Sequence, residues 1–421
     1  MRPALVSVLL VSIASGQVAP GKAIQSIFAN AGGTDGLVIV GRANPRVNVT
    51  GLTAQNIQNV NSVALDPIDN SVWLGSINTA PTTHGLRRAA LTGSTLGTAT
   101  LVASLPTAPN GTFSGISFDQ NGNPIVTSGV TPPNTGGVFR VNRRTGAVTN
   151  LLAPHAAISP SGTVNCVDVD LATGDIYFGV VDGSPGAGGR IFKLPGPFPN
   201  TAAPVLVGTC QPASNSVTIT GVAFRPAVGA TPARVYFTNY ATGNTSVGYV
   251  NAAGGASVVV AGTPFSFPGM NWIAYDRTAD DFWLCTGGPN PDQVFTMSPI
   301  GASAFVTDLG ANGTPSAIDA NDNPYGSHRV VPQHVPTTTY TIEQSVTGNP
   351  GDIAVLGIDF GTGPIAVTAG YFDGSGTFWA SYPGINYGPG SPGTIVWVCA
   401  SVTTDLQTIH FINSSAPWPL N

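Results

Sequence analysis

Charge is the scarcest property of this sequence of 421 residues. Charged residues make up only 8%, with two lysines (Lys22 and Lys193) and one glutamate (Glu343), and the net charge is −5. Nucleic-acid binding depends on clustered basic side chains, and this sequence has no such cluster, so we expect no nucleic-acid partner. Long charged side chains are also good helix formers. Thr, Ser, Val, Asn and Gly take their place here, so we expect an all-β protein.

Long hydrophobic runs are equally scarce. The longest candidate covers residues 4–13, preceded by Arg2 and followed by the small residues 14–16. This order is typical of a signal peptide over residues 1–16, with cleavage before Gln17. No run is long enough for a membrane-spanning helix. The sequence therefore predicts an exported protein, secreted, periplasmic or at the cell surface, without a membrane span. Nothing in it indicates oligomerisation, so we expect a monomer.

Cysteine is rare as well, and its spacing does not suggest zinc. The four cysteines are Cys166, Cys210, Cys285 and Cys399. Export permits disulfides, and four cysteines allow three pairings. Cys166 and Cys210 flank one repeat unit, whereas a bond between Cys285 and Cys399 would join the tail to the repeats. Buried free thiols are the alternative.

Glycine and proline, in contrast, are abundant, at 53 and 36 residues, and they separate short apolar runs. One pattern recurs: an apolar run, an acidic turn and a second run with an aromatic residue. Its copies lie at residues 61–75, 114–129, 165–179, 220–239, 271–287 and 316–326. Two further short runs follow each of the first five copies. Four antiparallel strands every 45 to 55 residues are typical of a β-propeller blade.

The sixth copy is short, with a first strand near residues 317–320 and a possible second strand after Pro324. Residues 37–40 and 47–52 form spare strands before the first copy. We predict that these N-terminal strands complete the sixth blade, because ring closure removes exposed sheet edges. The predicted domains are a six-bladed β-propeller over residues 17–335 and a small β-sandwich over residues 336–421. In the alternative interpretation, some runs of the tail are blade strands.

Four copies, VALDPIDNSVWLG, ISFDQNGNPIVTSG, VDVDLATGDIYFG and IAYDRTADDFWLCTG, carry a resemblance to a known superfamily. They resemble blades of secreted bacterial six-bladed propellers of the NHL, regucalcin/gluconolactonase and virginiamycin-B-lyase-like superfamily, over about residues 37–325. In gluconolactonase-like members the resemblance implies a divalent metal at the tunnel mouth, held by a Glu, an Asn and an Asp. Asn165 and Asp319 are the candidates for two of these ligands, whereas no Glu precedes Glu343. Virginiamycin-B-lyase-like members use a His and a Glu with Mg²⁺.

Four aspartates end the first run of their copies: Asp66, Asp119, Asp170 and Asp276. A carboxylate at this point accepts backbone N–H bonds and holds a tight turn. Equivalent positions lie in different blades and do not converge on one ion. We therefore predict a turn role, which also tolerates Arg225 in the fourth copy.

The second residue of each first run is a better candidate for chemistry. This axial column reads Ala64, Ser117, Asp168, Ala223, Ala274 and Asp319. Small residues are expected where six inner strands crowd the axis, and Asp168 and Asp319 break that pattern in opposite blades. Carboxylates at the axis are costly unless they are hydrated, paired or bound to a cation. One hypothesis is a Ca²⁺ or Mg²⁺ site with Asp168, Asp319 and Asn165, and the other is a wet channel.

A polar column precedes the first runs and reads Asn61, Ser114, Asn165, Thr220 and Asn271. We expect it to ring the tunnel mouth, where it would bind a polar ligand together with Asp168 and Asp319. The alternative is that these side chains cap loop backbone.

These features predict a binding or scaffold module whose ligand is an unnamed small molecule, glycan or protein, with no required cofactor. The alternative is a metal-dependent hydrolase or lyase, lactonase-like, with its site at the tunnel mouth. No GxSxG, HExxH or P-loop motif identifies catalytic residues.

Overall fold

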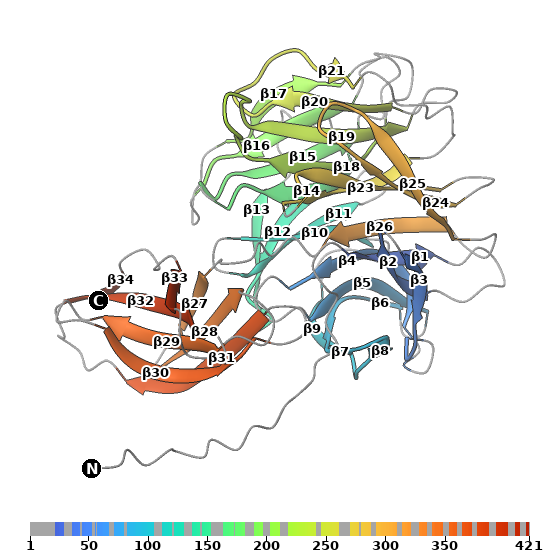
Figure 1. Cartoon of the computed structure of the whole chain (residues 1–421). Coiled ribbons are helices and arrows are strands. Elements are labelled where there is room, and N and C mark those ends of the chain that lie inside the picture. Colours follow the sequence, from blue (N-terminus) through green and yellow to red (C-terminus); the bar gives the residue numbers. More distant parts are fainter. Residues whose placement is uncertain are drawn as a thin grey trace, which may run out of the picture.

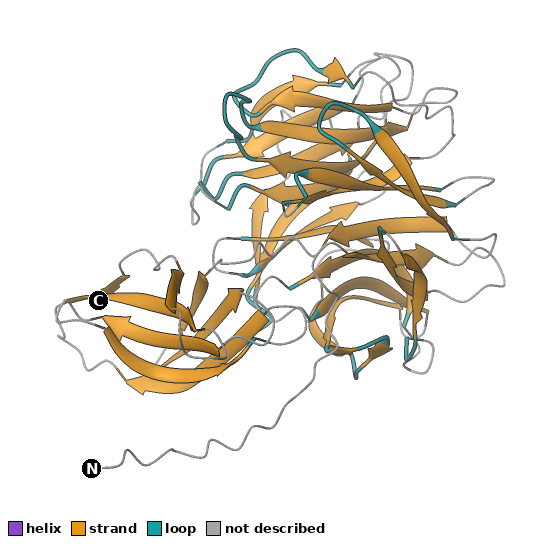
Figure 2. Cartoon of the chain, in the orientation of Figure 1, coloured by secondary structure: helices purple, strands orange, loops and turns teal. Residues whose placement is uncertain are grey.

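A computed structural model of the chain describes separate stretches of sequence between Lys22 and Leu420 (Figure 1). The described residues are 22–28, 36–42, 44–52, 55, 57–66, 71–79, 82–104, 112–119, 122–129, 137–143, 145–152, 163–171, 173–181, 189–196, 203–210, 218–240, 246–260, 270–277, 279–287, 292–309, 314–320, 328–334, 339–347, 353–359, 364–372, 377–386, 393–402, 409–412 and 418–420. Every labelled element in them is a strand (Figure 2). Within these stretches no helix has the length and apolar character needed to cross a membrane.

Six four-stranded antiparallel sheets form the blades of a β-propeller, as predicted. From the innermost strand outward, blade 1 contains β4 (Gln58–Leu65), β5 (Val72–Thr79), β6 (Thr82–Ala89) and β9 (Thr100–Ser104). Blade 2 contains β10 (Thr112–Phe118), β11 (Pro124–Gly129), β12 (Gly137–Val141) and β13 (Val148–Leu152). Blade 3 contains β14 (Thr163–Val169), β15 (Ile176–Val181), β16 (Arg190–Leu194) and β17 (Val205–Thr209).

Blade 4 contains β18 (Thr218–Arg225), β19 (Arg234–Tyr240), β20 (Ser246–Asn251) and β21 (Val258–Val259). Blade 5 contains β22 (Met270–Asp276), β23 (Asp281–Thr286), β24 (Gln293–Met297) and β25 (Ser303–Asp308). Blade 6 contains β26 (Thr314–Ala320), β1 (Lys22–Phe28), β2 (Gly36–Gly41) and β3 (Asn44–Val49).

The ring closes in blade 6, where three N-terminal strands pair onto one late strand. β1 pairs with β26 in the register Ile24↔Asp319, which confirms the predicted closure. Two details of the prediction were wrong. β1 was not expected, and it occupies the place beside β26 that was assigned to a strand after Pro324. That segment supplies β27 (His328–His334), which pairs with β28 (Thr339–Thr347).

A small hairpin, β7 (Leu91–Thr92) with β8 (Thr95–Leu96), covers the crossing from blade 6 to blade 1. The Gln55 side chain joins the crossing to this hairpin, because its amide nitrogen donates to the carbonyls of Gly51 at 3.0 Å and Gly97 at 2.8 Å. Its oxygen accepts the Ala99 N–H at 2.6 Å. Hydrogen bonds of the Gln55 side chain therefore strengthen the connection between blade 6 and blade 1.

Apolar and aromatic side chains fill the space between blades. Each innermost strand contacts the innermost strands of both neighbouring blades, so the inner ring is closed. The rings of Tyr177 and Phe224 stack with centroids 5.2 Å apart, and those of Tyr236 and Phe282 lie 4.3 Å apart. These contacts show that Tyr177 and Tyr236 of the second strands belong to inter-blade cores.

Glycine allows two of these inner strands to approach each other closely. A Cβ atom on Gly221 in β18 would lie 2.8 Å from the Ile273 nitrogen in β22. A Cβ atom on Gly115 in β10 would lie 3.1 Å from the Cys166 Cα in β14. Both separations are too short for a larger residue without movement of the backbone.

The C-terminal strands form two further sheets. One has the order β27-β28-β31 (Thr377–Asn386). The other has the order β30 (Pro364–Tyr371), β29 (Ile353–Asp359), β32 (Gly393–Val402) and β33 (Ile409–Ile412), with β34 (Trp418–Leu420) also paired to β32. Val346 of the first sheet packs with Leu356 and Phe372 of the second. Two sheets that share an apolar cluster form a small sandwich. The domain boundary at 335/336 stays a prediction, and β27 lies before it.

Candidate functional site

The axial cavity lies where the six innermost strands meet. Residues from β4, β10, β14, β18, β22 and β26 line it, and its volume is about 80 Å³. Pockets for drug-sized ligands measure roughly 300–1,000 Å³, while one water needs about 10–15 Å³. The charged side chains among its described lining residues are Asp168, Arg277 and Asp319. The cavity therefore has room for a few waters or an ion, and both unusual aspartates of the axial column face it.

Asp168, at the axial end of β14, makes hydrogen bonds to three blades. Its Oδ2 accepts the Phe224 N–H from blade 4 at 2.6 Å. Its Oδ1 accepts the Val169 N–H of its own strand at 2.8 Å and the Ser117 hydroxyl of blade 2 at 2.9 Å. Since donors reach both oxygens, the carboxylate ties blades 2, 3 and 4 together.

Asp319 makes the same kind of junction on the opposite side of the ring. Its Oδ2 accepts the Leu65 N–H of blade 1 at 2.7 Å. Leu65 pairs with Val72 as Phe224 pairs with Val235, so the two donors occupy equivalent positions. An innermost strand is an edge of its sheet, and alternate N–H groups along it lack a ladder partner. Each aspartate therefore satisfies an edge donor of the next blade.

The electrostatics of Asp168 follow from this enclosed position. The side chain is half-buried, and its exposed part faces the narrow cavity. Burial raises the pKa of the Asp168 carboxyl, while the N–H groups of Phe224 and Val169, the charge of Arg277 and the Ser117 hydroxyl act in the opposite direction. Burial has the larger effect, so the pKa of the Asp168 carboxyl lies above its ordinary value despite these donors and the cation.

A divalent cation would need more ligands than the described cavity residues offer. Ca²⁺ takes six to eight oxygens and Mg²⁺ takes six. The described residues contain no group of three or more His, Cys, Asp or Glu that would hold a metal ion. Asp168 and Asp319 face the cavity, but Asn165 is not among its lining residues. The proposed ligand set of Asp168, Asp319 and Asn165 therefore gains no support from this geometry.

The polar column marks a β-bulge that recurs in every blade. At a register shift between the innermost strand and its neighbour, a residue is left out of the pairing: Asn61, Ser114, Asn165, Thr220, Asn271 or Ser316. Blade 1 has a second shift, which leaves out Asn59. A bulge residue has no cross-strand partner, so a small polar side chain at this point can bond nearby backbone. The Ser114 hydroxyl donates to the Val164 carbonyl at 3.2 Å, and the Thr220 hydroxyl lies 2.9 Å from that of Thr238.

This column does not join the two aspartates in the axial cavity. Asn61 and Asn165 are half-buried, and neither lines the cavity, nor do Ser114 and Thr220. The side chain of Asn271 lies outside the described residues. The structure therefore brings Asp168, Asp319 and Ser117 together at the axis and places the polar column along the bulges.

The recurring turn aspartates lie at the rim, where the first strand of each blade ends. Asp119 accepts the Asn123 N–H at 2.8 Å, and Asp170 accepts the Thr173 hydroxyl at 2.9 Å. These bonds confirm the predicted turn role. Asp66 has a further function, because its Oδ2 accepts the Trp73 indole N–H at 3.0 Å and an Arg143 N–H from blade 2 at 2.9 Å.

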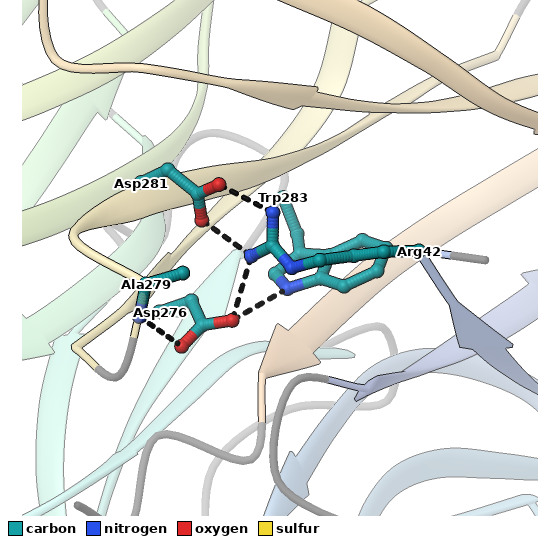
Figure 3. Close-up of polar contacts among 5 residues, drawn as sticks. All are labelled: Arg42, Asp276, Ala279, Asp281 and Trp283. Carbon is teal, nitrogen blue, oxygen red and sulfur yellow. Dashed lines mark hydrogen bonds and ion pairs between the residues drawn. The ribbon is translucent and has the colours of Figure 1, made fainter.

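Asp276 forms the equivalent cluster between blades 5 and 6. Its Oδ2 accepts the Trp283 indole N–H at 3.3 Å and an Arg42 N–H at 2.8 Å. Figure 3 shows the Arg42 side chain between Asp276 and Asp281, beside the indole of Trp283. The guanidinium carbon lies 5.0 Å from the indole centroid. Arg42 and Arg143 both follow the third strand of the next blade, so these ion pairs to buried aspartates join neighbouring blades.

Blade 4 reverses the charges of this rim cluster. Arg225 stands where other blades carry the turn aspartate, and its Nε and Nη2 bond the two carboxylate oxygens of Asp280 in blade 5 at 2.7 Å each. Asp280 has a φ of 51° at the turn position that Gly174 occupies in blade 3. Hydrogen bonding to Arg225 lowers the pKa of the Asp280 carboxyl. Sequence reasoning missed this pair, and the available signal was the Asp-to-Arg exchange at position 225.

Of the two alternatives for the cysteines, the described ones fit buried free thiols. Cys166, Cys210 and Cys285 are free and buried. Burial raises the pKa of the Cys166 and Cys285 thiols to about 12. Such thiols stay protonated and pack as small apolar groups within the inter-blade core. The side chain of Cys399 lies outside the described residues.

Comparisons with known proteins give likeness at the level of fold. No family model matches the sequence, and no curated protein matches it. A chain from the crystal structure of a nidogen/laminin complex matches with a TM-score of 0.52 and 13% identity, covering 72% of this chain and 100% of that one.

Two bacterial structures match less closely. PorZ, a surface component of the type-IX secretion system of Porphyromonas gingivalis, matches with a TM-score of 0.41 and 13% identity over 95% of this chain and 58% of PorZ. An auxiliary nutrient binding protein from Bacteroides ovatus matches with a TM-score of 0.42 and 13% identity over 64% of this chain and 67% of that chain. At these identities the nidogen/laminin match shows the fold alone, and the two bacterial matches carry no functional argument.

Proposed function

We propose that this chain is an exported propeller, related to the NHL and gluconolactonase-like group, that acts as a binding or scaffold module. The observation that carries the proposal is the use of Asp168 and Asp319 as inter-blade hydrogen-bond acceptors. Because Asp168 and Asp319 bond backbone of the neighbouring blades, they are poor candidates for catalysis. A rigid ring of blades instead offers surfaces for a partner. A chain of similar fold takes part in the nidogen/laminin complex, which is a precedent for this use.

Export rests on the pattern of Arg2, the apolar residues 4–13 and the small residues 14–16. The full chain, expressed in a bacterial host with its own N-terminus, is expected to appear outside the cytoplasm and to begin at Gln17. N-terminal sequencing of the purified protein reads this directly. Retention of Met1 in a cytoplasmic product would refute export.

The competing function is a metal-dependent, lactonase-like hydrolase with Asp168 and Asp319 as ligands for Ca²⁺ or Mg²⁺. Thermal unfolding of the mature chain with millimolar Ca²⁺ or Mg²⁺, together with a panel of lactones and glycans, separates the two. A ligand that binds the folded state raises the melting temperature, by the equivalent of about 2.7 kcal/mol at 100 times its Kd. We expect a glycan or another non-reacting ligand to do so without turnover.

Three variants make this test specific: Asp168→Ala and Asp319→Ala at the axis, and Asp170→Ala at a rim turn as the control. A saturable rise with a divalent ion, lost in both axial variants and kept in Asp170→Ala, would overturn the binding proposal when lactone turnover accompanies it.

A further inference from the structure

In four blades, the residue at the start of the second strand accepts a hydrogen bond through its side chain. The acceptors are Ser71, Asn123, Asp175 and Asp281, each opposite the rim residue of the first strand. Their donors are, in the same order, the Nε of Arg88 at 2.8 Å, the backbone N–H of Arg143 at 3.2 Å, the Nζ of Lys193 at 3.0 Å and the guanidinium of Arg42. In blade 4 the register Arg225↔Arg234 places Arg234, a donor, at this position.

Arg234 has no carboxylate partner among the described residues. The carboxylate of Asp280 is bonded by Arg225. The Arg234 guanidinium lies 4.0 Å from the ring centroid of Tyr249, which stands where blades 1 to 3 carry a cation. Its Nη1 is 3.5 Å from the Tyr236 hydroxyl, and its buried Nε has no hydrogen-bond partner. Five donors thus share one long contact, so the rim of blade 4 carries an excess of positive charge.

Two segments next to this cluster carry exposed aliphatic side chains. The Tyr236 hydroxyl donates to the Pro299 carbonyl at 2.9 Å, which places the next residue, Ile300, beside the cluster. Ile300 is 81% exposed. The hairpin from Arg225 to Arg234 carries Val228, which is 43% exposed. Arginine and tyrosine are enriched among the residues that dominate the energy of protein–protein contacts.

We propose that Arg234, Tyr249, Val228 and Ile300 form a docking surface for a protein partner that presents a carboxylate side chain next to aliphatic residues. Charge complementarity selects the carboxylate, since a guanidinium binds it through two parallel N–H bonds. Stacking on Tyr249 holds the guanidinium plane in place before binding, which lowers the entropic cost. The surface specifies one partner chemistry for the binding function proposed above and rests on that function.

The test uses the mature full chain, labelled with ¹⁵N at arginine, and two synthetic peptides. One is acetyl-Gly-Leu-Glu-Ile-Gly-amide, and the other has Gln in place of Glu. We expect the Glu peptide to shift the Nε–H resonance that is absent from Arg234→Gln, and the Gln peptide to leave it unmoved. Loss of a charge-assisted hydrogen bond of about 1.5–3 kcal/mol corresponds to roughly tenfold or more weaker binding in Arg234→Gln.

Controls separate this surface from general attraction of anions. Arg190→Gln removes another arginine that lies over an aromatic ring, that of Phe192, and is expected to bind the Glu peptide as the unmodified chain does. Ile300→Ser is expected to weaken the peptide and leave binding of free N-acetylglutamate amide unchanged. Equal affinity for peptide and free acid would overturn the protein partner. No Nε–H shift with either probe would overturn the surface, while the metal and glycan results above would still stand or fall on their own.

Discussion

The axial and the rim aspartates of this propeller join neighbouring blades with different donors. At the axis, Asp168 and Asp319 accept uncharged backbone N–H groups of the next blade. At the rim, Asp66 and Asp276 accept an indole N–H and the guanidinium of an arginine from the next blade. The carboxylates of Asp66 and Asp276 are therefore matched by a full positive charge, whereas that of Asp168 relies on dipoles and on the charge of Arg277.

This difference explains why the axial column looked like a chemical site. A carboxylate in a narrow cavity with a shifted pKa is a candidate for catalysis or metal binding. Here its cost is offset because edge N–H groups of the innermost strands also need acceptors. Two structural needs meet in one residue, and opposite blades use the same solution.

The largest expected effect is at the rim, in Asp66→Ala. Asp66 is buried with Arg143 and Trp73, so its removal leaves a buried guanidinium and an indole N–H without their acceptor. Breaking a buried pair from one side costs about 3–5 kcal/mol of unfolding free energy. Urea denaturation measures this loss, with Asp170→Ala at a more exposed rim turn as the control. A loss no larger than that of the control would show that the rim ion pair does not hold blades 1 and 2.

The next effect is at the axis, in Asp168→Ala. It removes the acceptor of Phe224 N–H, Val169 N–H and the Ser117 hydroxyl. We expect a loss of about 1.5–3 kcal/mol, because part of the cost is recovered when a buried charge disappears. Urea denaturation of Asp66→Ala and Asp168→Ala under one condition ranks the two regions. A larger loss at the axis than at the rim would contradict the ranking.

The pH dependence should have opposite signs at the two regions. The pKa of Asp168 is raised above its ordinary 3.8, so the folded protein binds this proton more readily than the unfolded chain does. Its contribution to stability therefore increases as pH falls through the raised pKa and levels off below 3.8. The pKa of Asp280 is lowered, so its contribution is complete above 3.8 and is lost as pH falls through the lowered pKa.

Urea denaturation between about pH 7 and pH 3 tests these signs against Asp168→Asn and Asp280→Asn. The unmodified chain should gain stability relative to Asp168→Asn on acidification toward pH 4. Its advantage over Asp280→Asn should stay constant until about pH 4 and then shrink. Parallel profiles for both variants would contradict the assignment of the two environments.

The smallest effect separates the two arginines of blade 4. Arg225→Gln breaks the bidentate pair with Asp280 and should cost about 1–2 kcal/mol. Arg234→Gln removes no ion pair and should change the unfolding free energy by less than about 0.5 kcal/mol. The same denaturation series compares them. Equal losses would mean that Arg234 is already engaged in the folded chain and is not held ready for a partner.

The fold was largely predictable because blade repeats act at the level of hydrophobic pattern. The six copies of the repeat predicted six blades, and the spare N-terminal strands predicted how the ring closes. β1 was missed because its sequence, KAIQSIF, contains buried Gln25 and Ser26, which weaken the apolar signal. β27 was misplaced because strand propensity does not say which sheet a strand joins.

The site was only partly predictable, for a related reason. Repeat alignment found Asp168 and Asp319 as exceptions, but a donor such as Phe224 N–H is backbone and leaves no mark in the sequence. The polar column was interpreted as a ring of ligand-binding residues because its β-bulges arise from the pairing between strands, which the sequence does not show. The ion pair between Arg225 and Asp280 spans two blades. Repeat alignment showed Arg225 as an exception, but it gave no sign that Asp280 was its partner.

Amide hydrogen exchange at Phe224 and Leu65 tests the central claim, that each axial aspartate holds an edge N–H group of the next blade. In Asp168→Ala, exchange at Phe224 should accelerate by about tenfold or more, and exchange at Leu65 should stay unchanged. In Asp319→Ala we expect the reverse: exchange at Leu65 should accelerate by about tenfold or more, and exchange at Phe224 should stay unchanged. Unchanged protection of Phe224 in Asp168→Ala and of Leu65 in Asp319→Ala would contradict the inter-blade role and return both carboxylates to the list of candidate catalytic or metal-binding groups.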